Sequence, residues 1–362
     1  MSSAAFLGLG LIGGSLAKAL RLQYPQMKIK VYDPNTDTLQ SALDLGVASQ
    51  VYSTLSSEVC DCDYLFLCAP VEYNIANLKS ILPYLREDTI LSDVGSVKAP
   101  IHKDIEALHL ESQFIGGHPM AGSERFGFLN SSAALLENAY YILTPGSKVS
   151  QDKIDCFQKL IRDIGAIPYL LNYDKHDMAT AAISHLPHVL AASLVNVVKA
   201  SEDEAGTLCT LAAGGFKDIT RIASSSPEMW EQICIENKEN LLKLLDQTKE
   251  ILEQFKSYVT VENGDDIYKF FDSARTYRNT FSDLSGGPIL KQYTCTINIA
   301  DKTGALADVV TLLANHKVNI KNIGIVHNRE LQEGALKMEF YSQKDFTLAK
   351  ELLIKQQYAI YE

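Results

Sequence analysis

The stretch FLGLGLIGGSLAKAL, residues 6–20, decides the fold of the N-terminal part of the chain. An apolar run at residues 4–9 leads into a loop with glycines at positions 8, 10 and 13, and a helical pattern continues to about Leu22. A second apolar run, residues 29–33, ends in Asp33 and stops at Pro34. A strand, a glycine loop, a helix and a second strand ending in an acid form the pattern of a dinucleotide-binding βαβ unit.

Each glycine of this loop has a distinct physical task. Gly8 permits a tight turn, Gly10 lets a pyrophosphate approach the backbone, and Gly13 lets the helix pack closely on the strand. The N-terminus of the helix then offers amide hydrogens and a positive dipole to the phosphates. A glycine turn without a ligand is the alternative. We expect cofactor contacts at Gly8, Gly10, Leu11, Ile12, Gly13, Asp33 and Pro70.

The position of Asp33 indicates which dinucleotide binds. It ends the second strand about 20 residues beyond Gly13, where a carboxylate can accept hydrogen bonds from both ribose hydroxyls. The same charge would repel a 2′-phosphate, and no arginine follows directly in residues 34–36. The sequence therefore favours NAD over NADP, although Asp33 could also be a surface acid before a turn.

Further strand and helix patterns alternate along the N-terminal part. Such alternation predicts βαβ units and a mainly parallel sheet, so we expect an α/β domain of the Rossmann type over residues 1–168. The expected strands are residues 64–69, 89–93, 114–116 and 140–144, and the expected helices are residues 37–45, 73–82 and 99–108.

The rest of the chain has two other patterns. Residues 169–282 carry long amphipathic helical patterns and almost no strand signals, with faces apolar enough to predict burial against a twin chain in a homodimer. Residues 283–292 have the composition of a linker. Residues 293–362 follow the order β-α-β-β-α-β, which is that of a ferredoxin-like α+β domain.

Composition limits the possible partners. With 46% hydrophobic and 21% charged residues, the 362-residue chain is an ordinary globular protein of two or three domains. Its net charge of −11 disfavours nucleic acid and anionic membranes, but allows an anionic small molecule at a local basic site. No apolar run approaches the length of a membrane span. Seven scattered cysteines indicate reduced thiols in a cytoplasmic protein and no zinc site.

Two loops at the expected carboxyl edge of the sheet carry candidate catalytic groups. Ser96 lies in SDVGSVK, residues 92–98, and His118 lies in GGHPMAGSERFG, residues 116–127. Beside a nicotinamide, a neutral imidazole could accept the proton of a substrate hydroxyl as hydride leaves the same carbon. Ser96 could hold the same oxygen or fix the tautomer. A surface histidine in a tight loop is the plain alternative for His118.

The helical region adds candidate binding groups. His185 and His188 are three residues apart in a helical stretch, but no third metal ligand is apparent, so we expect no metal site. Both could equally be satisfied core histidines. Arg221 could pair with Asp218 on a helix, or its guanidinium could hold a substrate carboxylate through two hydrogen bonds.

Taken together, these motifs resemble the prephenate dehydrogenase family over essentially the whole chain. The resemblance rests on GLGLIGGSLA (residues 8–17), SDVGSVK, GGHPMAGSERFG, SHLPHVLA (residues 184–191) and GGFKDITRIASSSPEMWEQICIENKENL (residues 214–241). The tail, with INIADKTGALADVVTLLANHKVNIKNI (residues 297–323), resembles an ACT domain, a module that commonly binds an end-product amino acid between paired copies.

The resemblance implies an activity and a set of roles. The reaction would be oxidative decarboxylation of prephenate by NAD to 4-hydroxyphenylpyruvate, with aromatisation of the ring as the driving force. His118 would bond the 4-hydroxyl with Ser96 as its partner, and Arg221 would bind a carboxylate. The implied substrate-binding set is Arg221, His188, His185, Ser123, Glu124 and Trp230. Lys98 and Lys217 are further candidate cations for the dicarboxylate, with plain solvated lysines as the alternative.

The ACT-like tail implies regulation. Gly304, Asn319 and Ile320 would face the ligand groove, and tyrosine would bind there and lower activity. Two other functions stay open at this point. One is oxidation of arogenate, the aminated analogue, by the same chemistry. The other is a non-catalytic amino-acid sensor built on a dinucleotide-binding fold.

Overall fold

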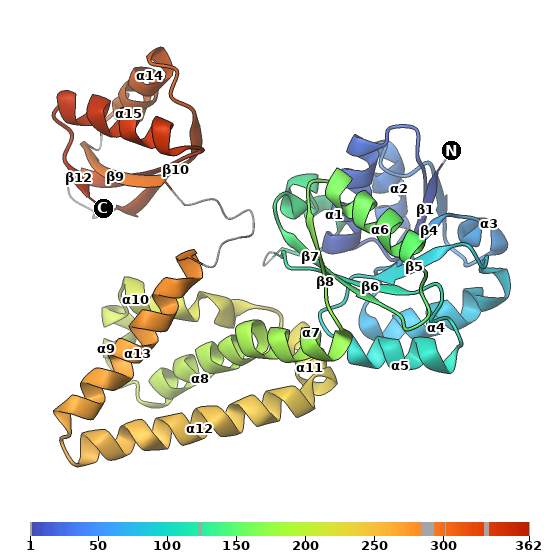
Figure 1. Cartoon of the computed structure of the whole chain (residues 1–362), viewed down its shortest axis with the longest axis horizontal. Coiled ribbons are helices and arrows are strands. Elements are labelled where there is room, and N and C mark those ends of the chain that lie inside the picture. Colours follow the sequence, from blue (N-terminus) through green and yellow to red (C-terminus); the bar gives the residue numbers. More distant parts are fainter. Residues whose placement is uncertain (1, 123–124, 284–292, 301, 329–332, 362) are drawn as a thin grey trace. The chain divides into compact units, whose positions relative to one another are not determined.

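Strand β1 (Ser3–Leu7) lies at the middle of a five-stranded parallel sheet with the order β3-β2-β1-β4-β5 (Figure 1). This computed structural model describes residues 2–122, 125–283, 293–300, 302–328 and 333–361. The chain divides into two units, residues 1–254 and 255–362. The other strands of the sheet are β2 (Lys28–Tyr32), β3 (Gln50–Tyr52), β4 (Tyr64–Leu67) and β5 (Ile90–Asp93).

Alternate side chains of β1 enter two separate cores. Phe6 faces one core and stacks on Phe66 of β4 with ring centroids 5.0 Å apart, whereas Leu7 faces the other. Each core is closed by helices that cover one face of the sheet, as expected for consecutive βαβ units. One face carries α1 (Leu11–Gln23), α2 (Thr36–Asp44) and α6 (Gln151–Asp163), and the other carries α3 (Ser57–Cys60), α4 (Val71–Ile81) and α5 (Ala99–Ala107).

Three more strands extend this α/β region. They are β6 (Ile115–Pro119), β7 (Tyr140–Pro145) and β8 (Ile167–Leu170), with β6 antiparallel to β7 and β8 parallel to it. A parallel bridge between Leu91 and Phe114 joins β6 to the edge of the first sheet. The mainly parallel α/β sheet predicted from the sequence is therefore confirmed, although the short strands β3 and β8 were not predicted.

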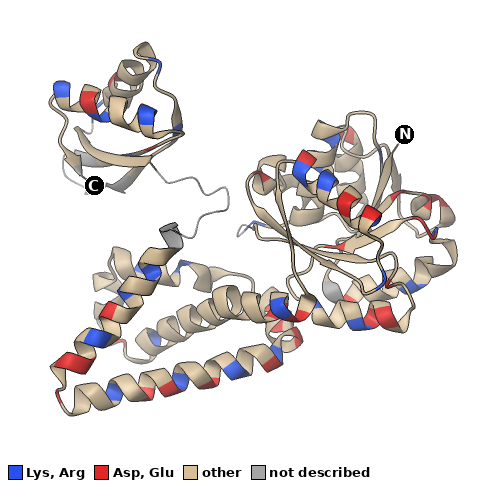
Figure 2. Cartoon of the chain, viewed as in Figure 1, with Lys and Arg blue, Asp and Glu red and all other residues tan. Residues whose placement is uncertain are grey.

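A helical region follows in the first unit. Its elements are α7 (Tyr173–Thr180), a π-helical turn (Ala181–His185), α8 (Leu186–Ala200), α9 (Thr207–Leu211), α10 (Gly214–Thr220), a 3₁₀ turn (Arg221–Ser224), α11 (Pro227–Glu236) and α12 (Lys238–Thr260), the last of which crosses into the second unit. Figure 2 shows few charged residues on α8 and both signs of charge along α12. Several apolar side chains face outward and are at least 61% exposed: Ile183, Val197, Leu211 and Ile219.

One stretch of this region corrects an expectation from the sequence. By length and composition, Tyr173–Ala200 could cross a membrane, with a mean hydropathy of 1.5 and 17% of its most apolar window buried. The expectation that no segment approaches a membrane span is therefore wrong on this criterion. His176 and Asp177, near its start, are hydrogen-bonded to the α/β region, and this contact is typical of a helix packed within a protein.

The second unit contains a small α/β sandwich after α13 (Gly264–Asp283). Its antiparallel sheet has the order β10-β11-β9-β12, and its two helices bury Val309 and Leu353 against Ile297 and Leu336. This confirms the predicted β-α-β-β-α-β order of a ferredoxin-like fold. The elements are β9 (Tyr293–Ala300), α14 (Ala305–Asn315), β10 (Ile320–Asn328), β11 (Glu333–Phe340), α15 (Gln343–Lys355) and β12 (Ile360–Tyr361).

The glycine loop gives a test of the fold. Gly8 has φ +91°, and a Cβ there would lie 2.6 Å from the backbone nitrogen of Ala69. We expect Gly8→Ala to lower the free energy of unfolding by about 2–4 kcal/mol, because left-handed backbone and overpacking both cost energy. Gly10→Ala is the matched control, since a Cβ at Gly10 meets nothing within 4 Å. Calorimetry should show a lower Tm for Gly8→Ala alone, and equal Tm values would contradict the strain at Gly8.

Candidate active site

The glycine loop leaves space for a ligand at one position only. A Cβ at Gly13 would lie 2.8 Å from the Cys68 side chain, so Gly13 is needed for close packing, like Gly8. Gly10 faces open space and precedes α1, where Leu11 and Ile12 begin the helix. This is the arrangement that a pyrophosphate requires, with bare backbone at the N-terminus of a helix.

Asp33 lies at the carboxyl end of β2 and is tied to this loop. Its Oδ2 accepts a hydrogen bond from the backbone N–H of Leu9 at 2.8 Å, and its Oδ1 accepts one from the N–H of Asn35 at 2.8 Å. Each carboxylate oxygen has a second lone pair that could accept a ribose hydroxyl. Pro70 is exposed directly before α4, at the carboxyl end of the neighbouring strand β4. The residues of the loop thus fit a dinucleotide.

A buried ion pair organises the loop after β5. Asp93 Oδ2 contacts the ammonium of Lys98 and accepts the N–H of Gly95, and Asp93 Oδ1 accepts the N–H of Gly117 at 3.1 Å. Lys98 also donates to the carbonyl of Gly117 at 2.8 Å, and its side chain is fully buried. The expected role of Lys98 as a cation for substrate does not fit this position, because its ammonium is used to hold β6 beside β5.

His118 lies on β6 and is the first of three connected polar groups. Its Nδ1 is 2.8 Å from Nε2 of His176, and Nδ1 of His176 is 2.7 Å from Oδ1 of Asp177. His176 and Asp177 are both buried. Burial is the main cause that lowers the pKa of His118 well below its usual value, and the neighbouring His176, Lys98 and His185 act in the same direction. His118 is therefore neutral at neutral pH, as a proton acceptor must be.

The helical region supplies a second cluster around Trp230 of α11. The imidazole of His188 stacks on the indole with ring centroids 3.8 Å apart, and the ring of His185 meets it edge-on at 5.9 Å. His188 Nδ1 is 2.8 Å from the carbonyl of Ser184, which requires an N–H at that nitrogen. Trp230 Nε1 is buried and has no hydrogen-bond partner among the described residues. This donor is available for a ligand.

His185 is fixed within the protein. The side-chain amide of Asn237 donates to its Nδ1 at 3.2 Å and to the backbone carbonyl of Asp177 at 2.7 Å. Burial lowers the pKa of His185 to about 4, so the ring is neutral at neutral pH. His185 ends the π-helical turn, a feature that occurs frequently at functional sites.

Three further candidates lie at exposed or half-buried positions. Arg221 begins the 3₁₀ turn after α10, is exposed, and lies close enough to His188 to lower the pKa of that imidazole, after the larger effect of burial. Lys217 is exposed on α10. Ser96 is half-buried in the loop after β5. Ser123 and Glu124 lie outside the described residues.

The candidates of the second unit lie at the two ends of α14. Gly304 has φ +91° and precedes the helix, with open space where a Cβ would stand. Asn319 is exposed just before β10, which begins at the half-buried Ile320. An 11-residue helix separates the two positions by about 16 Å.

Sequence reasoning missed four functional candidates: Asp93, His176, Asp177 and Asn237. All four act through contacts between distant segments, such as the 58-residue separation of His118 and His176. The sequence carried no signal for His176 and Asp177, because they lie in the polar run NYDKHD, residues 172–177, which is typical of a solvent-exposed helix start.

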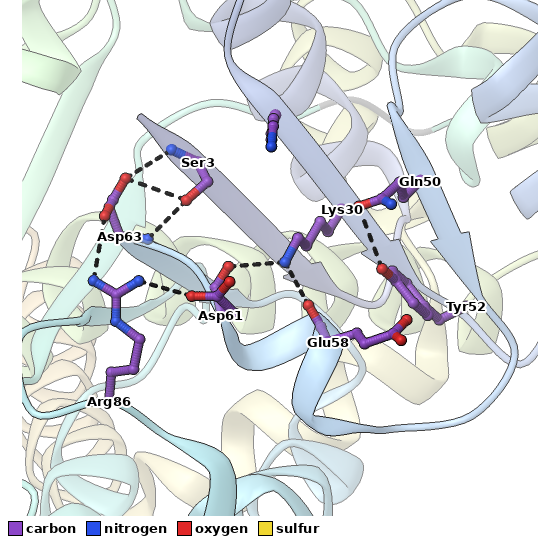
Figure 3. Close-up of a pocket in the computed structure, with 9 residues that line it drawn as sticks. Ser3, Lys30, Gln50, Tyr52, Glu58, Asp61, Asp63 and Arg86 are labelled. Atoms are coloured by element: carbon purple, nitrogen blue, oxygen red, sulfur yellow. Dashed lines mark hydrogen bonds and ion pairs between the residues drawn. The ribbon is translucent and has the colours of Figure 1, made fainter. Parts of the chain in front are cut away.

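One cavity among the described residues lies elsewhere and is not this site. It measures about 470 Å³ and is lined by residues near the amino ends of the strands, including Ser3, Lys30 and Arg86 (Figure 3). Ligands of doubly wound sheets bind at the opposite, carboxyl edge. Lys30 donates to backbone carbonyls of Glu58 and Asp61, and Arg86 pairs with Asp61, Asp63 and Asp88, so these charged groups satisfy one another.

Comparison with known proteins matches most of the chain to two family models. Residues 16–170 match the model of the prephenate dehydrogenase nucleotide-binding domain, and residues 172–273 match that of the prephenate dehydrogenase dimerization domain. Prephenate dehydrogenase of Bacillus subtilis is 34% identical over 96% of this chain and 94% of its own length.

Two solved structures share the fold of the first part of the chain. Prephenate dehydrogenase of Aquifex aeolicus, in complex with hydroxyphenyl propionate and NAD⁺, has a TM-score of 0.73 and 31% identity, covering 78% of this chain and 98% of that one. Arogenate dehydrogenase of Synechocystis has a TM-score of 0.70 and 28% identity, covering 77% of this chain and 99% of that one. On the sequence match to the Bacillus subtilis enzyme and the two domain models, the chain belongs to the prephenate dehydrogenase family.

Proposed function

We propose that this protein is an NAD-dependent prephenate dehydrogenase, which forms 4-hydroxyphenylpyruvate, CO₂ and NADH from prephenate. The observation that carries the proposal is the neutral, half-buried imidazole of His118 at the carboxyl edge of a dinucleotide-binding sheet. Relatives that bear this enzyme's name match along nearly their full lengths.

His118 is the proposed hydrogen-bond acceptor for the 4-hydroxyl of prephenate. Its Nδ1 is used toward His176, which leaves Nε2 for the substrate. NAD, when bound, accepts the hydride from C4. As the hydride leaves, His118 takes the proton of the hydroxyl, and loss of CO₂ then delivers an electron pair to the ring. The proton returns to the oxygen as the ring becomes a phenol, so no net proton is released.

The helical region is proposed to bind the rest of the substrate. Arg221 would hold a carboxylate beside His188, and the unpartnered indole N–H of Trp230 would donate to the same group. Ser96, from the loop after β5, would contact the 4-hydroxyl with His118. Ser123, Glu124, His185 and Lys217 remain proposed contributors to the pocket. A dicarboxylate needs such local cations because the protein carries a net charge of −11.

The assembly is proposed to be a cytoplasmic homodimer formed through the helical region. The outward-facing apolar side chains of α8 to α10 support this, as does the match to a dimerization domain. We retain as proposals the domain bounds of 1–168, 169–282 and 293–362, with a linker between the last two.

The direct test is NADH formation at 340 nm with the purified protein, NAD and prephenate. His118→Asn should lower kcat by about 10²–10⁴-fold, because the proton acceptor is lost, while NAD still binds. The matched control is His109→Asn, the same substitution at an exposed residue whose left-handed backbone (φ 58°) asparagine tolerates.

Substrate choice is read in the same assay with arogenate. Turnover of arogenate alone would support the same chemistry but identify the enzyme as an arogenate dehydrogenase. Inactivity with both substrates, or full activity of His118→Asn, would overturn the proposed function.

Asp33 is proposed to select NAD over NADP. Asp33→Asn should raise the ratio of kcat/KM for NADP to that for NAD by about tenfold, because the repulsion of a 2′-phosphate is lost. The control Asp37→Asn removes a nearby exposed carboxylate that does not bond the glycine loop. If the ratio of kcat/KM for NADP to that for NAD were unchanged in Asp33→Asn, Asp33 would not be the residue that selects the cofactor.

The C-terminal ferredoxin-like domain is proposed to be an ACT domain that binds tyrosine and inhibits the enzyme. Gly304 and Asn319 lie at opposite ends of α14, about 16 Å apart, so one tyrosine could contact both only if they came from two paired copies. This separation supports a ligand groove between copies, with Ile320 beside Asn319.

Asn319→Ala should raise the tyrosine concentration needed for half-inhibition at least tenfold, because a hydrogen-bonding amide is lost, while the uninhibited kcat stays unchanged. Gln356→Ala, which removes an exposed amide elsewhere in the same unit, should leave inhibition as in the wild type. Unaltered inhibition of Asn319→Ala would place the effector elsewhere, for example in the active site.

A further inference from the structure

We infer that His176 and Asp177 are positioning residues for His118, and that together they hold its ring proton on Nδ1 and keep Nε2 free as an acceptor. The inference rests on the proposed function, in which Nε2 of His118 receives the substrate proton. It follows from the hydrogen-bonding capacity of each group in the chain Asp177–His176–His118.

Asp177 fixes the direction of its hydrogen bond with His176, because a carboxylate can only accept hydrogen bonds. Its Oδ1 accepts the backbone N–H of Lys98 at 2.8 Å, and its Oδ2 accepts that of Ala99 at 2.7 Å. These are donors at the start of α5, where the helix dipole also favours a negative charge. Two amide N–H groups and the positive end of the helix dipole face this carboxylate, so both of its oxygens act as acceptors. The third contact of the carboxylate, with Nδ1 of His176, must therefore come from an N–H.

His176 transmits this constraint to His118. With its proton on Nδ1, the neutral ring of His176 has a lone pair on Nε2, which is 2.8 Å from Nδ1 of His118. His118 must then donate from Nδ1. Its second nitrogen, Nε2, carries no proton and can act as the base. The tautomer of the catalytic ring is thus set by a carboxylate two groups away.

Further contacts hold the chain Asp177–His176–His118, called the relay from here on, in place. Thr180 Oγ1 donates to the backbone carbonyl of His176, and Asn237 donates to that of Asp177. Asn172 caps the start of α7 by accepting the N–H groups of Asp174 and Lys175. When His118 gains a proton, its Nδ1–H remains bonded to His176, and the charge of Asp177 compensates the imidazolium across one ring.

The first experiment determines the tautomer directly. In the full-length wild-type protein with ¹⁵N-labelled histidine, ring-nitrogen NMR should show the proton of His118 on Nδ1, with His118→Asn used to assign its signals. A His118 proton on Nε2 in the wild type would overturn the inference. This readout needs no turnover, so it stays decisive even if prephenate proves not to be the substrate.

The second experiment separates positioning from structural support. His176→Leu removes the acceptor and should lower kcat about 100-fold. His176→Gln keeps an acceptor oxygen and should recover at least tenfold of that loss, with KM for both substrates near wild type. Asn172→Ala is the control, because it removes the cap of the same helix and lowers stability without changing a group of the chain Asp177–His176–His118.

Three results would overturn the relay: kcat of His176→Leu within threefold of wild type, no recovery in His176→Gln, or an equal loss of kcat in Asn172→Ala. If His176→Leu fails to fold, His176→Gln and the wild-type tautomer still decide the question. Absence of wild-type turnover with both prephenate and arogenate would instead count against the proposed function.

Discussion

The carboxylate of Asp177 accepts two backbone amides at the start of α5, and this contact fastens the helical region to the α/β sheet. Hydrogen bonds to a charged group contribute about 1.5–3 kcal/mol each, and their loss would leave buried N–H groups without partners. The same carboxylate orients His176 and, through it, His118. One side chain therefore contributes both to the docking of the two regions and to the orientation of the His118 ring.

A second buried charge pair works on the sheet side of the site. Asp93 and Lys98 are both buried, and replacing such a pair by apolar residues is often neutral or stabilising. The role of this ion pair is to bind backbone groups of the neighbouring loop and strand. Asp93 binds the amides of Gly95 and Gly117, and Lys98 binds the carbonyl of Gly117, the residue before His118. A Cβ at Gly117 would lie 2.5 Å from the Asp93 carbonyl, so β6 can lie this close to β5 only because residue 117 is a glycine. The polar network fixes where β6, the strand that carries His118, lies.

Local patterns in the sequence were sufficient for part of this architecture. The glycine loop and Asp33 are consecutive parts of one βαβ unit, so their spacing alone predicts how they meet, and Asp33 does bond the loop at Leu9. His118 was predicted from its place after a strand. His176 and Asp177 were missed because their roles arise from contacts with residues 58 and 79 positions away. Lys98 was taken for a substrate cation, since a sequence does not show that an ammonium is already paired inside the fold. The expectation that no segment approaches a membrane span rested on unbroken apolar runs, whereas Tyr173–Ala200 meets the criterion through its length and mean hydropathy.

An unsatisfied hydrogen-bonding group distinguishes the candidate site from the cavity near Ser3, Lys30 and Arg86. At the amino edge of the sheet, Arg86 and Lys30 have carboxylate and carbonyl partners, so a ligand there would have to displace existing contacts. In the helical region, the indole N–H of Trp230 is buried beside two neutral histidines and has no partner within the described residues. An unpaired buried donor costs about 1–3 kcal/mol, which a bound acceptor would restore. A carboxylate that accepted the indole N–H of Trp230 would remove this free-energy cost, and its binding would be strengthened accordingly. This property is expected of a site that binds an anion.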